Sequence, residues 1–335
     1  MLRRGGGGAG APDLGGFALV INSALCYSTL GVFAKIAFAS QMRLGPLLAT
    51  RFTLAAACLW AMVLLSPGGR AAIPRLDRRH ALALLVCGIF GYAGQAAIFF
   101  SALRWISASL TVVLLYTCPA FLALIVWGTT GRRPGGARLA AIALAMGGTY
   151  LSAAPRLGGE GAAGAALAVL AGLWYACFLL LLYRLTPGVP GLVSGALVIT
   201  GAAIAFDAAV LATGDYAPPA DAPQWMAILG LVVVSTLMSF VLFINGLKRV
   251  GPQVASILST FEPLGTLLIA AIVLGERLTA TQSAGAALVI GAAFVLATTA
   301  AGAARPAGPA PMVAGASSSG GADASAGGAA AAVPD

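Results

Sequence analysis

The sequence predicts an all-α membrane protein in which ten transmembrane helices form two inverted five-helix repeats. The first observation is compositional: the 335 residues are 60% hydrophobic and only 9% charged, with a mean hydropathy of +0.96. Soluble domains carry about 25% charged residues. The second observation is that apolar stretches of similar length recur along the chain. The third is that the second half of the chain repeats the residue pattern of the first.

Each apolar stretch is close to the roughly 20 residues that an α-helix needs to cross about 30 Å of hydrocarbon. Only helices and closed barrels satisfy their backbone groups in lipid, and these stretches lack the alternating pattern of barrel strands. We therefore expect membrane-spanning helices at residues 16–38, 45–65, 81–103, 106–128, 137–154, 162–183, 191–213, 225–246, 253–274 and 280–301.

The internal repeat is clearest where residues 102–134 align without a gap on residues 246–278. The identical pairs are Leu103/Leu247, Leu114/Leu258, Pro119/Pro263, Leu124/Leu268, Ile125/Ile269, Gly131/Gly275 and Arg133/Arg277. Five spans in each half is an odd number, so the second half enters the membrane inverted relative to the first. The predicted domains are a first repeat at 16–154 and a second at 162–301, and such duplication is typical of transporters.

The net charge of +9 is explained by membrane topology rather than by nucleic-acid binding. With the N-terminus inside, the inner segments carry thirteen basic residues and the outer loops four, which follows the positive-inside rule. The outer four are Arg43, Arg104, Arg156 and Arg277. We therefore expect a multi-pass protein of the cell inner membrane with both termini in the cytoplasm.

The remaining segments predict no further folded domain. Residues 1–15 are polar and rich in glycine, and residues 302–335 are mostly Ala, Gly, Ser and Pro, so both are expected to be disordered in the cytoplasm. All five cysteines fall inside predicted spans, so we expect no disulfide framework, no metal site and no cofactor.

The second half contains the motifs Glu262-Pro263-Leu264 and Leu274-Gly275-Glu276-Arg277-Leu278, and the first half contains the shorter echo of Pro119 and Gly131. Together these motifs resemble the EamA type of the drug/metabolite transporter superfamily. Ala102-Leu103, Gly246-Leu247 and Arg51 also fit this resemblance, which covers about residues 16–301. The first half departs from the pattern because Cys118 and Arg132 stand where the second half has Glu262 and Glu276.

The resemblance implies a ten-helix carrier of small metabolites or drugs, usually an exporter. It also implies a central cavity lined mainly by the first, third, fourth, sixth, eighth and ninth helices. It does not imply a particular solute.

Glu262 is the most informative single position, because it lies near the middle of the ninth predicted span. A charged side chain there costs on the order of 2.5–3.5 kcal/mol on insertion scales, so we expect it to face the bundle interior or a cavity. Burial favours its neutral form. Two roles remain open: proton coupling or recognition of a cationic solute group, and a neutral carboxyl that holds two helices together by hydrogen bonds.

Pro119 and Pro263 are repeat mates inside predicted spans. Each removes the hydrogen bond to the carbonyl four residues earlier, at Leu115 and Ser259, and is expected to bend its helix. A symmetric pair of bends frees backbone carbonyls that can line a cavity.

Buried charges and aromatic residues supply the other candidates. Arg51 and Asp207 are placed where they can pair, as an outer gate or, by preference, a structural lock, whereas Lys35 is expected to extend towards the membrane surface. Gln95 shares a helix face with Tyr92 and Phe99. The candidate binding residues for a small amphipathic solute are Tyr27, Gln95, Tyr116, Trp174, Tyr175 and Glu262.

A stripe of small residues, Ser283, Ala287 and Gly291, has an echo in Ala143 and Gly147. This spacing predicts close helix contact along these faces.

The sequence thus predicts a secondary active transporter, and not an enzyme, that exports a small amphipathic metabolite or drug by alternating access. Proton coupling through Glu262 belongs to this hypothesis. The alternatives are an uncoupled facilitator of the same fold and a non-transporting scaffold or membrane enzyme. The expected partners are a small-molecule solute, protons and the lipid bilayer. The sequence leaves the oligomeric state open.

Overall fold

The computed structural model describes residues 13–131, 135–153, 161–186, 189–258 and 261–303. The described part of the chain is helical and contains no strand. Residues 1–12 and 304–335, which hold most of the segments expected to be disordered, lie outside the described residues.

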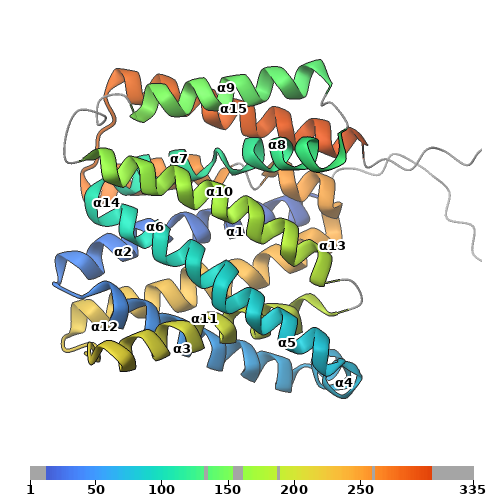
Figure 1. Ribbon diagram of the computed structural model, residues 1–335, viewed down its shortest axis with the longest axis vertical. Helices are drawn as coiled ribbons and strands as arrows, with labels where there is room; N and C mark the ends of the chain where they lie inside the picture. Colours follow the sequence, from blue (N-terminus) through green and yellow to red (C-terminus); the bar gives the residue numbers. More distant parts are fainter. Residues whose placement is uncertain (1–12, 132–134, 154–160, 187–188, 259–260, 304–335) are drawn as a thin grey trace, which may run out of the picture. The chain divides into compact units, whose positions relative to one another are not determined.

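The helices follow one another with short connections (Figure 1). The elements that precede residue 154 are α1 (Leu14–Ser28), α2 (Leu30–Ala39), α3 (Leu44–Leu65), α4 (Pro67–Ala72), η1 (Ile73–Arg75), α5 (Arg78–Val86), η2 (Cys87–Tyr92), α6 (Ala93–Trp105), α7 (Ala108–Leu115), α8 (Cys118–Thr130) and α9 (Gly136–Ala153). The later elements are α10 (Gly161–Leu185), α11 (Gly191–Thr213), α12 (Ala222–Leu229), η4 (Gly230–Met238), α13 (Ser239–Leu258), α14 (Phe261–Leu274) and α15 (Ala280–Ala303).

Seven helical segments in the described ranges are long and apolar enough to cross a membrane. They are Leu14–Ala39, Leu44–Leu65, Arg78–Trp105, Ala108–Thr129, Gly161–Leu182, Gly191–Thr213 and Ala222–Phe243. Three shorter apolar helices occur at Leu139–Ser152, Phe261–Leu274 and Ala280–Val295. The described part of the chain is therefore all-helical, with several helices suited to a multi-pass membrane protein, whereas the ten-helix arrangement in two repeats stays a prediction. One boundary differs from expectation, since α13 continues from the eighth predicted span into the ninth.

Four helix pairs have the most extensive contacts. α3 lies along α11, α9 along α15, α1 along α13, and α10 along α6. Figure 1 shows α9 beside α15 and α3 beside α11. Each pair joins one helix that precedes residue 154 to one that follows residue 160, so the two parts of the chain are interleaved.

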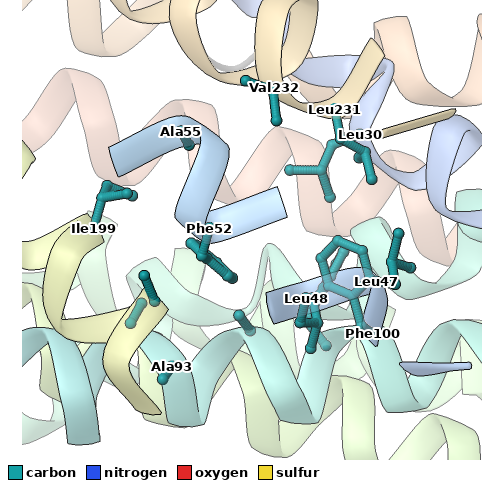
Figure 2. Packing of buried hydrophobic residues seen from close by; sticks show 14 of the residues in the cluster. Leu30, Leu47, Leu48, Phe52, Ala55, Ala93, Phe100, Ile199, Leu231 and Val232 are labelled. Atoms are coloured by element: carbon teal, nitrogen blue, oxygen red, sulfur yellow. The ribbon is translucent and has the colours of Figure 1, made fainter. Parts of the chain in front are cut away.

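The largest buried cluster draws side chains from α2, α3, α6, α11 and η4, among other elements (Figure 2). Phe52 is 1% exposed; its ring stacks on Phe206 at 5.3 Å and meets the edge of Tyr92 at 5.5 Å. Lipid tails are as apolar as these side chains, so close van der Waals packing rather than escape from water stabilises such a cluster.

Glycines allow two of the helix contacts to be backbone-to-backbone. A Cβ on Gly88 of η2 would overlap the carbonyl of Val198, and one on Gly201 of α11 would overlap the carbonyl of Leu85. In the α9–α15 contact, Gly148 and Gly285 play the same part. Such close approach is typical of small residues at membrane helix interfaces.

The predicted small-residue stripe lies on these helices but not in the contact. Ser283, Ala287 and Gly291 are exposed, and a Cβ on Gly147 or Gly291 would meet nothing within 4 Å. The contact face is displaced by about one residue around each helix, because many positions of α9 and α15 carry small side chains and several stripes fit the same spacing.

Two predicted spans are interrupted near their middle. α1 ends at Ser28 and α2 begins at Leu30, while α7 ends at Leu115 and α8 begins at Cys118. The second interruption agrees with the bend expected at Pro119, which lacks the N–H that would continue the hydrogen-bond ladder. The bend expected at Pro263 involves Ser259, which lies outside the described residues.

Hydroxyl side chains satisfy the carbonyls at both interruptions. Thr29 Oγ1 donates to the carbonyl of Cys26 at 2.6 Å and Thr117 Oγ1 to that of Leu114 at 2.7 Å. Ser28 Oγ lies 2.7 Å from the carbonyls of both Ala24 and Glu262, which share its single proton. A broken helix is tolerated inside a membrane protein when side chains satisfy the freed backbone groups in this way.

We expect Gly201→Ala to destabilise the protein by about 1–3 kcal/mol, because the new methyl group must push η2 away from α11. Thermal unfolding of the purified protein in detergent measures the effect. Gly147→Ala is the matched control: its methyl group meets open space, and it gains the higher helix propensity of alanine. Equal unfolding temperatures for the two variants would contradict the packing argument.

Candidate functional site

Glu262 lies in the first turn of α14, and both its backbone and its side chain are held by other helices. Its carbonyl accepts hydrogen bonds from Ser28 Oγ of α1 at 2.7 Å and from Thr266 Oγ1 at 3.1 Å. One carboxylate oxygen accepts from Tyr116 Oη at 2.8 Å. Glu262 therefore connects α1, α14 and the interruption between α7 and α8.

Close contact between α1 and α14 fixes this arrangement. Thr266 Oγ1 lies 3.2 Å from the carbonyl of Ser28, and a Cβ on Gly265 would overlap Ser28 Oγ. The missing side chain at Gly265 lets the hydroxyl of Ser28 reach the backbone of α14.

A small cavity opens beside Glu262. Its walls come from α1, α2, α3, η2, α6, α7 and α14, so it lies next to both helix interruptions. The cavity measures about 30 Å³, which is room for roughly two or three water molecules at about 10–15 Å³ each. The described conformation is thus contracted around the cavity, and an organic solute requires its walls to separate.

The cavity walls combine aromatic rings with a few polar groups. Tyr27, Tyr92, Phe99 and Phe100 supply the rings. The polar or charged lining residues are Arg51, Gln95, Glu262 and Thr266. Such a mixture suits solutes with an apolar body and one or two polar groups.

Arg51 departs from the sequence-based expectation. The predicted gate or lock requires an ion pair between Arg51 and Asp207, but no ion pair joins these two residues in the described structure. Asp207 instead accepts a hydrogen bond from Thr53 Oγ1 at 2.7 Å. Arg51 turns inward, where its side chain lines the cavity between the rings of Phe52 and Phe100. The two side chains thus have different partners, which a linear sequence does not reveal.

The structure brings four of the six predicted binding residues together. Tyr27, Gln95 and Glu262 line the cavity, and Tyr116 reaches it through its hydrogen bond to Glu262. Tyr175 packs against Phe178 with ring centroids 6.1 Å apart and is not part of the lining.

Trp174 has a different environment from the one expected. Its indole N–H donates to the carbonyls of Gly91 at 3.0 Å and Phe90 at 3.3 Å, both in the π-helical segment η2. The side chain is 40% exposed and lies over Gly94. In this conformation, Trp174 therefore satisfies the backbone of η2 outside the cavity.

Three residues of the site, Thr266, Ser28 and Phe100, are not among those predicted from the sequence. Thr266 follows Glu262 by one helical turn, so i to i+4 spacing was the available signal. Ser28 and Phe100 join the site through contacts between distant helices, for which the sequence carries no local signal.

Glu276 forms a second polar connection, at the start of α7. Its two carboxylate oxygens accept from the backbone N–H groups of Ala108 at 2.8 Å and Ser109 at 3.0 Å, and from Ser109 Oγ at 2.8 Å. Backbone N–H groups at a helix start have no helical partner, and the helix dipole favours negative charge there. Glu276 thus fastens the segment after α14 to the beginning of α7.

No group of three His, Cys, Asp or Glu side chains able to hold a metal occurs among the residues that the structure describes. The groups that a solute can contact in the cavity are its aromatic, amide, hydroxyl and charged side chains.

The comparison with known families decides the identity of the chain. The protein-family model described as "EamA-like transporter family" matches residues 14–154 and again residues 162–298 of this chain. The chain belongs to the EamA-like transporter family. This family lies within the drug/metabolite transporter superfamily, so the protein is a membrane transporter of that type.

Two curated relatives agree with this assignment. "Uncharacterized transporter YcbK" of Bacillus subtilis (strain 168) is 28% identical over 287 residues, which cover 81% of this chain and 88% of the relative. An "Uncharacterized transporter" of Archaeoglobus fulgidus is 43% identical over 67 residues, or 20% of this chain and 25% of the relative.

A solved structure shows the same fold. Described as "Crystal structure of protein", it aligns with a TM-score of 0.58 at 21% identity, and the alignment covers 85% of this chain and 98% of the solved one.

We expect Glu276→Ala to destabilise the folded protein by about 1–2 kcal/mol, because two N–H groups at the start of α7 lose their acceptor. Thermal unfolding in detergent measures the loss, and Arg277→Ala is the control at the neighbouring residue. A Glu276→Ala variant as stable as Arg277→Ala would show that the cap contributes nothing.

Proposed function

We propose that this transporter is a secondary active carrier that exports a small amphipathic metabolite or drug by alternating access. The observation that carries the proposal is the position of the cavity. Residues up to Leu115 form most of its wall, while Glu262 and Thr266 complete it from the second half of the chain. A movement between the two halves therefore opens or closes the cavity directly.

An inverted repeat is part of this proposal, and several paired features support it. Gly131 and Gly275 are repeat mates, and both adopt positive φ, 67° and 65°, after α8 and α14. The segment η4 contains the repeat mates of η2, and both are π-helical. The family match also falls on two successive stretches. Two inverted halves can exchange conformations, which exposes a central site to either side of the membrane.

The two halves differ at their connecting segments. Glu276 caps α7, whereas its repeat mate in the sequence is Arg132. An arginine has no acceptor for backbone N–H groups. We propose that the Glu276 cap favours closure at the end of the bundle where α7 begins.

The proposed topology follows the positive charges, with both termini in the cytoplasm and the chain in the cell inner membrane. Under this topology α7 begins on the outer side. Closure there leaves the cavity to fill from the cytoplasm, which is the loading side of an exporter.

Coupling to protons is assigned to Glu262. Its carboxyl is the acidic group that lines the cavity, and its partner Tyr116 sits at the interruption between α7 and α8. A change in its protonation therefore alters a bond at the point where one helix is able to bend. If Glu262 only joins the two helices, the same fold acts as an uncoupled facilitator.

Solute uptake into proteoliposomes, with a panel of labelled amino acids, purine derivatives and cationic drugs, tests the function. We expect a pH gradient to enhance accumulation in wild type but not in Glu262→Gln, because an amide does not exchange a proton. Asp207→Asn is the matched control, since this carboxylate does not line the cavity.

If solute accumulation in Glu262→Gln depends on the pH gradient as strongly as in wild type, Glu262 does not take part in proton coupling. Uptake to equilibrium in all three proteins, without any response to the pH gradient, would establish the facilitator. Failure of every solute to accumulate would favour a non-transporting role.

A further inference from the structure

Among the residues that the structure describes, Arg51 is a buried cation without a charged partner. Its side chain is 2% exposed and lines the central cavity. The Nε atom is buried and has no hydrogen-bond partner within the same ranges. The ion pair found there joins Arg43 to Asp215, and neither of these residues lines the cavity.

The surroundings of Arg51 stabilise its charge only in part. The guanidinium carbon lies 4.9 Å from the ring centroid of Phe52 and 5.1 Å from that of Phe100. Such contacts offset only part of the free energy that burial of an ion costs. Aromatic faces also offer no acceptor of the kind that the guanidinium N–H donors require, and Arg has about five of them.

Nearby carboxylates do not fill this role in the described part of the chain. Asp207 is engaged by Thr53. Glu262 lines the same cavity, but its carboxylate accepts from Tyr116 and forms no ion pair with Arg51. The site thus holds a fixed positive charge that faces an open space, an arrangement suited to an incoming anion.

We propose that Arg51 binds a carboxylate of the transported solute, and that the solute is a small aromatic carboxylate. The inference rests on the proposed transport function and names its substrate class. A guanidinium matches a carboxylate through two parallel N–H···O bonds, which gives both affinity and orientation.

The composition of the cavity sets the charge and the body of this solute. Among the described lining residues Arg51 is the one cationic side chain, so the site offers one bidentate partner to a single carboxylate. The rings of Tyr27, Tyr92 and Phe99 offer a flat aromatic body stacking and edge contacts. Gln95 adds an amide that can donate to a carboxylate oxygen.

Direct binding to the purified full-length protein tests the inference without a transport assay. The probes are benzoate, phenylacetate and 3-phenylpropionate, each compared by isothermal titration with its neutral amide. Phenylalanine and phenethylamine complete the set and show whether an added amino group contributes through Glu262. We expect wild type to bind at least one carboxylate about tenfold or more tightly than the matched amide.

Variants of Arg51 locate the preference. Arg51→Gln is expected to remove the preference for the carboxylate while leaving amide binding in place, and Arg51→Lys to keep part of it, because lysine retains the charge but not the bidentate geometry. Arg43→Gln is the control, since this exposed arginine pairs with Asp215 outside the cavity. If Arg51→Gln does not fold, the comparison of carboxylate and amide in wild type still decides.

Three results would overturn the inference: equal binding of carboxylate and amide by wild type, an unchanged preference in Arg51→Gln, or no saturable binding of any carboxylate probe. Proteoliposomes that accumulate a cationic or neutral solute alongside such a result would leave the proposed transport function intact and refute only the carboxylate class.

Discussion

Backbone hydrogen bonding in a medium without water is the constraint on which the rest of this structure depends. Lipid offers no partner to a free N–H or C=O group, so the spans are helical wherever they are described. The two interruptions lie inside the bundle, and Ser28, Thr29 and Thr117 supply their hydrogen bonds. The cavity lies beside these interruptions. The places where the helix ladder fails are thus also the places where polar atoms accumulate.

The same constraint governs the two charged residues of the cavity. Arg51 and Glu262 do not neutralise each other; aromatic rings face one, and a tyrosine hydroxyl binds the other. A direct pair would leave both groups satisfied and the cavity without a preference for a charged solute. Separate supports leave the guanidinium of Arg51 without a carboxylate partner among the described residues, and Ser28 and Thr266 bind the backbone carbonyl of Glu262.

Much of the fold was predictable because lipid imposes a simple rule of length and apolarity, and the helical stretches follow it closely. Glu262 and Gln95 were predictable as cavity-lining residues because a polar group in an apolar span has few places to go. The direction of the Arg51 side chain was not predictable, because it depends on the rotation of its helix. The predicted pair with Asp207 rested only on their opposite charges. The position of Trp174 was not predictable for a related reason. Its indole N–H binds backbone carbonyls of a π-helical segment, and the residue pattern does not predict that segment.

The glycine contacts at Gly88, Gly201, Gly148 and Gly285 leave no space for a side chain, and none of these residues lines the cavity. These four backbone contacts and the proposed solute cavity therefore use separate sets of positions. Mutations that reshape the aromatic wall do not have to disturb the backbone seams. Such a division allows the solute to change during evolution. Substitution of a few lining side chains can adapt the cavity to a new solute, while the glycines that join the helices stay in place.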